Sequence, residues 1–99
     1  MTRNFLIMLH VNTSSGSNWI EVFKGEALSF PSMLLKVDDL MEDWRFILNN
    51  GKPKVPNNEF IITLLSMQEV PHMIVDCNNL DFKRSEIAYE RELLEQKLS

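Results

Sequence analysis

The chain has 99 residues, which is enough for one domain but not two, because a half of that length would bury too little apolar surface to fold alone. Its hydrophobic fraction of 44% and charged fraction of 24% are typical of a globular domain. The net charge is −4, each half of the chain is acidic, and Lys and Arg are not clustered. We therefore expect a single domain over residues 1–99 that neither binds nucleic acid directly nor enters a membrane.

The cysteine content predicts a reducing compartment. Cys77 is the single cysteine, so no disulfide can form within the chain, whereas a secreted domain of this size usually has one. Arg3 precedes a short apolar stretch that superficially resembles a signal peptide, but the stretch contains His10 and no small-residue cleavage pattern follows it. We interpret it as a first β-strand and expect the protein to be cytoplasmic.

The N-terminal quarter has the composition of a β-hairpin. Residues 4–11 and 19–23 are rich in aromatic and β-branched side chains, and a Ser/Gly cluster at 14–17 separates them. Gly25 is expected to end the second strand. Because Pro31 follows, Ala27–Phe30 is expected to be at most an edge strand or a crossover.

The middle of the chain predicts two helices. Apolar residues recur with helical spacing up to Leu48, and a start at Asp38 would place acidic residues in the first turn, where the helix dipole favours them. We expect a helix over about 39–49, an extended segment over 33–37, and a left-handed stop at 49–51. Polar residues spaced i, i+4, i+7 in the following segment predict a second, mostly buried helix near 58–69.

The C-terminal third predicts a strand at 72–77, a turn at 78–79, and a helix from Leu80 or Asp81 to about 97. The fold class is thus α+β: a small antiparallel sheet, made of the N-terminal hairpin plus further strands, packs against two or three helices. The last helix carries two apolar stripes, so it either fills a corner between two elements or offers one stripe to a second chain as a homodimer interface. The stripes are Phe82, Tyr89 and Leu93 on one side, and Ile87, Leu94 and Leu98 on the other.

Residues able to carry catalysis are few. Cys77 could pair with His10 or His72, and Asp76 could orient the His72 imidazole, but no known nucleophile or metal-binding spacing surrounds them. The three glycines lie far apart and form no phosphate-binding loop. We expect a protein that is not an enzyme and that uses no metal or cofactor.

The densest charge feature of the sequence is the acidic cluster at residues 38–43, and it has two interpretations. It could be only a solvated helix start, or it could meet a basic surface on another protein, with a second acidic face on the last helix. The second interpretation predicts a small acidic inhibitor that associates stoichiometrically with another protein. The partner-binding residues would be Asp38, Asp39, Glu42, Asp43, Glu86 and Glu90.

Residues 36–47 read Lys-Val-Asp-Asp-Leu-Met-Glu-Asp-Trp-Arg-Phe-Ile. This stretch resembles the closing motif of the Thoeris anti-defence type of small phage proteins, in which an Asp-Leu-Leu-Ala-Glu/Asp-Asp-Trp-Glu run follows a strand. The family's opening pattern, a helix leading to a basic Gly-Trp turn, is missing here, and Ser17-Asn18-Trp19 is the nearest stretch to it. The resemblance implies a small phage or mobile-element protein, and the acidic inhibitor would then act on a host protein in phage and host conflict.

Known members of that family sequester a cyclised nucleotide signal, so the resemblance implies an alternative function as a small-molecule sponge. Such a site needs an apolar pocket with a few basic or amide groups for phosphates. Trp19 and the pair Asp43-Trp44 are the positions that match the family's pattern. The ligand-binding residues under this alternative would be Trp19, Trp44, Arg45 and Lys36, with Lys52 and Lys54 as further basic candidates.

Overall fold

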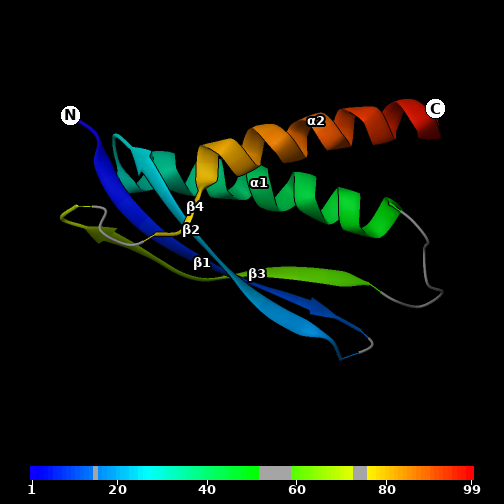
Figure 1. The fold of residues 1–99 in the computed structure, drawn as a ribbon, viewed down its shortest axis with the longest axis horizontal. Helices are drawn as coiled ribbons and strands as arrows, with labels where there is room; N and C mark the ends of the chain where they lie inside the picture. The colour runs from blue at the N-terminus through cyan, green and yellow to red at the C-terminus, as the bar shows by residue number, and fades with distance from the viewer. Residues whose placement is uncertain (15, 52–58, 73–75) are drawn as a thin grey trace.

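The structure is a computed structural model, and it describes residues 1–14, 16–51, 59–72 and 76–99. A β-hairpin is followed by a long helix, a third strand, a two-residue strand and a C-terminal helix (Figure 1). The α+β class predicted from the sequence is confirmed. The elements are β1 (Arg3–Thr13), β2 (Asn18–Ala27), α1 (Phe30–Asn50), β3 (Phe60–Val70), β4 (Asn78–Asn79) and α2 (Leu80–Leu98).

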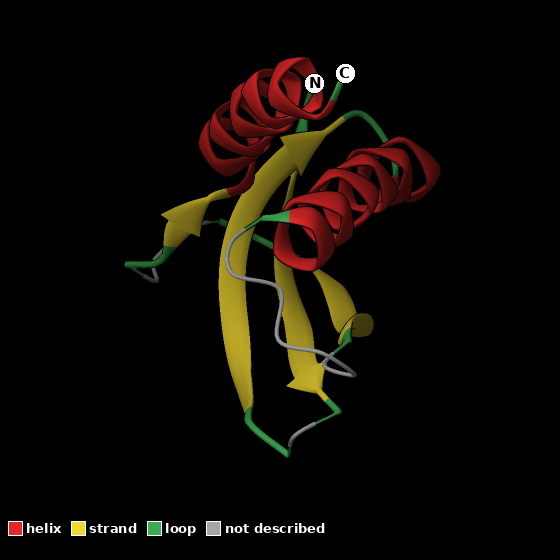
Figure 2. Cartoon of the chain, turned by 90° about the vertical axis from the view of Figure 1, so that its right-hand side faces the viewer, coloured by secondary structure: helices red, strands yellow, loops and turns green. Residues whose placement is uncertain are grey.

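The four strands form one sheet in the order β3-β1-β2-β4. β1 pairs antiparallel with both β2 and β3, while β4 runs parallel to β2. The sheet is therefore mixed rather than purely antiparallel, because the chain crosses from β3 on one edge to β4 on the other before α2 begins. Both helices cover the same face of the sheet (Figure 2). Among the described helices, none is long and apolar enough to cross a membrane.

The core lies between this covered face and the helices. Between Phe5 and Val11, alternate residues of β1 point toward the helices, and these four are fully buried, as the period-two geometry of a strand requires. From α1, Met33, Val37 and Leu40 pack against them. The buried β1 residues are Phe5, Ile7, Leu9 and Val11.

The predicted hairpin is confirmed, with longer strands than expected. Its turn is held by Thr13, whose hydroxyl donates to the Ser17 carbonyl at 3.0 Å, while Gly16 adopts a left-handed φ of 98°. Gly25 does not end the second strand: it pairs with Phe5, and β2 continues to Ala27. A Cβ at Gly25 would lie 2.9 Å from the Met33 Cε, so the end of the Met33 side chain packs directly on the β2 backbone at this glycine.

The start of the first helix was predicted wrongly. α1 begins at Phe30, not near 39, and the segment 33–37 is helical rather than extended. Ser29 is the N-cap, and it forms a capping box with Ser32, while Pro31 occupies the first turn, where its missing N–H costs nothing. The helix ends where expected, but Gly51 has a φ of −76°, so the stop is not left-handed.

The segment predicted as a helix near 58–69 is the strand β3. A β-bulge explains the error. β3 residues 64 and 66 face consecutive residues of β1, Leu9 and Met8, so Leu65 is an extra residue. The buried or half-buried inward positions are therefore 60, 62, 64 and 67, and strict alternation is lost. The β-branched residues Ile61, Ile62 and Thr63 favour the strand that is observed.

The predicted strand at 72–77 lies partly outside the described residues, since 73–75 are not described. His72, Asp76 and Cys77 do not belong to a strand, and the expected turn at 78–79 is the short strand β4. α2 follows the prediction closely, from Leu80 to Leu98. Its N-cap is Asn79, whose side chain accepts a hydrogen bond from the Phe82 N–H.

Candidate functional site

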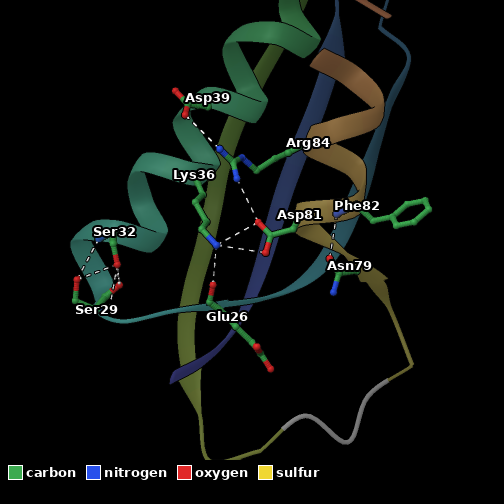
Figure 3. A network of polar contacts seen from close by, with 9 residues as sticks. All are labelled: Glu26, Ser29, Ser32, Lys36, Asp39, Asn79, Asp81, Phe82 and Arg84. Atoms are coloured by element: carbon green, nitrogen blue, oxygen red, sulfur yellow. Dashed lines mark hydrogen bonds and ion pairs between the residues drawn. The ribbon is translucent and has the colours of Figure 1, made fainter. Parts of the chain in front are cut away.

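The two helices lie side by side and are joined by ion pairs. Lys36 on α1 contacts Asp81 at 3.2 Å, and Asp39 contacts Arg84 at 3.4 Å (Figure 3). The Lys36 ammonium also donates a hydrogen bond to the Glu26 carbonyl of β2. Because the residue numbers of the partners rise together along both helices, α1 and α2 run in the same direction.

Arg91 makes the densest of these contacts. Its guanidinium donates to Asp43 at 2.9 Å and to Glu95 at 2.7 Å, and it lies 4.4 Å from the centre of the Phe46 ring. A third carboxylate, Glu42, is 3.7 Å away. The hydrogen bond to Glu95 raises the pKa of Arg91 most, and the bond to Asp43 and both negative charges raise it further, against a lowering by desolvation. Arg91 therefore stays charged.

These contacts change the meaning of the acidic cluster on α1. Asp39, Glu42 and Asp43 each contact an arginine of α2, so three of the four α1 acids predicted to bind a partner are used within the chain. Asp38 is exposed. The other three acids line an open groove of about 280 Å³ between the helices. Arg84 also lines this groove, and its buried Nε–H has no acceptor among the described residues. The groove thus has mixed charge.

The outward face of α2 carries an apolar stripe. The exposed fractions are 77% for Phe82, 62% for Tyr89 and 41% for Leu93, although all three are large and apolar or aromatic. At 3.6 residues per turn they fall within about 40° of one another, on the side of the helix opposite Ile87. Ile87 is only 2% exposed and belongs to the core. In the second predicted stripe, Leu94 is half-buried and Leu98 is 59% exposed. The stripe of Phe82, Tyr89 and Leu93 is thus directed outward, whereas the other faces the core only around Ile87.

Two carboxylates border one side of this outward stripe. Glu86 and Glu90 are exposed and lie beside Phe82, Tyr89 and Leu93 on the helical wheel. Glu86 lies 3.5 Å from the Lys83 ammonium, which in turn sits 5.6 Å from the centre of the Trp44 ring. We call the surface formed by Phe82, Glu86, Tyr89, Glu90 and Leu93 the α2 outer face.

A shallow hollow continues the α2 outer face at its N-terminal end. It has a volume of about 300 Å³ and lies between β4 and the first turns of α2. Phe82 and Glu86 belong to both the hollow and the α2 outer face, so one occupant could contact both surfaces. The hollow is lined by Asn78, Asn79, Phe82, Lys83 and Glu86.

The four residues of the alternative ligand site are held in different surroundings. Trp44 is 8% exposed, and its ring packs at 6.3 Å on Phe23 in the core. Trp19 lies in β2, donates to Glu21 and meets the Phe60 ring at 6.4 Å. Lys36 is engaged with Asp81, Arg45 is exposed, and no contact described here joins any two of the four. A nucleotide site built on them stays a prediction.

Among the described residues, no hydrogen bond or ion pair joins His10, His72, Asp76 and Cys77, the residues considered for catalysis. Cys77 is half-buried, whereas His72 and Asp76 are exposed. No group of three His, Cys, Asp or Glu side chains in the described part of the chain could hold a metal ion.

Sequence reasoning missed Arg84 and Arg91, the partners of the α1 acids. The sequence feature that could have indicated them is their spacing of seven residues, which places both basic side chains on the same side of α2. Comparison with known proteins adds no assignment: no family model, no curated protein and no solved structure matches the chain.

Proposed function

We propose that the protein is a non-catalytic binding protein that associates with another protein through the α2 outer face. The observation that carries this proposal is the exposure of Phe82 and Tyr89 on a helix whose other side is anchored in the core by Leu80 and Ile87. Large aromatic side chains at the centre of a patch are the usual anchors of protein interfaces. The carboxylates Glu86 and Glu90 beside them favour a partner whose surface is basic around an apolar groove.

Within this proposal the two acidic groups have different roles. Asp39 and Asp43 hold α2 against α1, while Glu86 and Glu90 act on the partner. The α1 acids thereby keep the α2 outer face in position without touching the partner. The resemblance to anti-defence proteins favours a phage or mobile-element origin, and for a protein of that origin we expect the partner to be a host protein.

The test begins with a partner protein captured by the tagged chain from its source cells and then purified. Tyr89→Ala should weaken its binding by about 30-fold, because truncating a central aromatic anchor costs about 2 kcal/mol. The double change Glu86→Gln and Glu90→Gln should lower the association rate and flatten its dependence on salt. Titration by calorimetry should give one partner per chain.

Leu35→Ala provides the matched control, because Leu35 is 67% exposed but lies on α1. It should leave the affinity unchanged. If Leu35→Ala and Tyr89→Ala weaken binding equally, or if neither does, the α2 outer face is not the interface.

A further inference from the structure

The strand β3 forms an edge of the sheet and has few of the features that protect such edges. It pairs with β1 on one side and with no described strand on the other. Its eleven residues, FIITLLSMQEV, include one charged residue, Glu69, and neither Lys, Pro nor Gly. Natural edge strands usually use such residues to prevent pairing with another chain. The bulge at Leu65 is the exception, and it leaves 60–64 as a regular strand.

The hydrogen bonds of neighbouring residues show which backbone groups face this edge. The Ser14 N–H donates to the Glu59 carbonyl, so Glu59 bonds toward the hairpin. The next residue, Phe60, faces the opposite way: its N–H donates to Asn49 Oδ1 at 2.9 Å, and its carbonyl accepts from Asn49 Nδ2 at 3.3 Å. Because the direction alternates along an antiparallel strand, the N–H and C=O groups of Ile62 and Leu64 also face the open edge.

The side chains beside these groups are apolar. On the sheet face that no described helix covers, Ile61 is 50% exposed and Leu65 is 49% exposed, with Thr63 between them. On the covered face, Ile62 and Leu64 pack against the core. An incoming strand would thus meet unpaired backbone groups between two rows of apolar side chains, and it must be extended to bond with them.

We propose that a second copy of the chain pairs with this edge, β3 against β3 in antiparallel orientation, about a two-fold axis at Thr63. Ile62 then faces Leu64 of the second copy as a hydrogen-bonded pair, and both have backbone groups directed outward, as such a pair requires. Ile61 faces Leu65 of the second copy on the uncovered face, so apolar side chains meet on both faces. Because each pair occurs twice, the strand is complementary to itself.

Neighbouring registers fit less well. An axis at Ile62 needs the backbone groups of Phe60, which Asn49 already occupies. An axis at Leu64 places the backbone of Ile62 opposite Ser66 and Ile61 opposite the inward-facing Met67. The axis at Thr63 joins the two four-stranded sheets into one continuous sheet, with all helices on the same face.

Sedimentation of the full chain over a micromolar concentration series tests this interface. The wild-type chain should approach twice its 11.6 kDa mass. Leu65→Lys should weaken dimerisation by about tenfold or more, because it places charge in the apolar contact. Ile20→Lys is the control, since Ile20 is 53% exposed on the same face but lies in β2. It should dimerise like the wild type.

The register has its own test. Ile61→Lys combined with Leu65→Glu should restore dimerisation relative to either single variant, because the two changed positions face each other only across the proposed axis. In the wild-type chain, raising the concentration should slow hydrogen exchange at the amides of Ile62 and Leu64, and not at Thr63, which bonds to β1.

A wild-type chain that stays monomeric throughout the series would overturn the proposal. So would an equal effect of Ile20→Lys and Leu65→Lys, which would indicate packing of sheet faces. Dimerisation lost through Leu93→Glu but kept in Leu65→Lys would assign the interface to α2 instead. Failure of the double variant to recover would overturn the axis at Thr63.

Discussion

Replacing Arg91 by methionine should lower the free energy of unfolding by about 2 kcal/mol, since methionine keeps an apolar stem of similar length but removes the guanidinium. In the ion pair with Asp43, both side chains are about three-quarters buried. This pair contributes about 1 kcal/mol, the upper end of the range for ion pairs near a surface. The i,i+4 pair with Glu95 contributes about 0.4 kcal/mol. Stacking on Phe46 contributes about 0.5–1 kcal/mol.

Urea unfolding followed by circular dichroism measures this loss, and the slope of the transition should not change. In a domain of this size the same loss should lower the Tm by about 8 °C or more. Arg91→Lys should fall between the wild type and Arg91→Met, because an ammonium keeps the charge but not the paired hydrogen bonds. A double-mutant cycle with Asp43→Asn should give a coupling of about 1 kcal/mol. A loss below about 0.5 kcal/mol for Arg91→Met would refute the view that these ion pairs hold α2 on α1.

Three further changes test how the elements are held. Ser29→Ala removes the capping box of α1 and should cost about 1 kcal/mol in urea unfolding, whereas a neutral result would mean that water replaces the cap. Asn49→Ala removes both hydrogen bonds to Phe60 and should cost about 1–2 kcal/mol; the Phe60 amide should exchange faster, and unchanged exchange would contradict the contact. Ile87→Ala should lower the free energy of unfolding by about 2–5 kcal/mol, because it leaves a cavity under α2. A loss below about 0.5 kcal/mol, as for a substitution at an exposed site, would show that α2 packs loosely.

The hairpin and α2 could be predicted because their signals are local. In the hairpin, two β-rich runs flank a Ser/Gly turn, and alternate residues from Phe5 to Val11 are buried as strand geometry demands. In α2, Asn79 caps a segment with helical spacing, and its two stripes indicated that one side would face the core. The sequence could not say which stripe, because that depends on Leu80 and Ile87 meeting α1 rather than on α2 itself.

β3 was mispredicted because its pattern is the product of two tertiary features. The bulge at Leu65 shifts the inward positions by one residue, so Leu64 and Met67 both face the core at a helix-like spacing of three. Ile61 and Leu65 lie exposed on the sheet face that no described helix covers. The outward positions of β3 are therefore not all polar, and the alternation of polar and apolar residues expected of a strand is lost. Neither the bulge nor the absence of a covering helix among the described elements is visible in the local sequence.

Whether the α1 carboxylates serve the fold or a partner depends on residues far along the chain. Like charges at i,i+4, such as Asp39 and Asp43, cost a helix about 0.2–0.5 kcal/mol. In the fold, Arg84 lies opposite the first and Arg91 opposite the second, so contacts from 45 and 48 residues away offset the repulsion. Neutralising these acids therefore loosens α2, and a resulting loss of binding would not separate docking from unfolding. Glu86, which has no contact with α1 among the described ion pairs, is where charge can be tested alone.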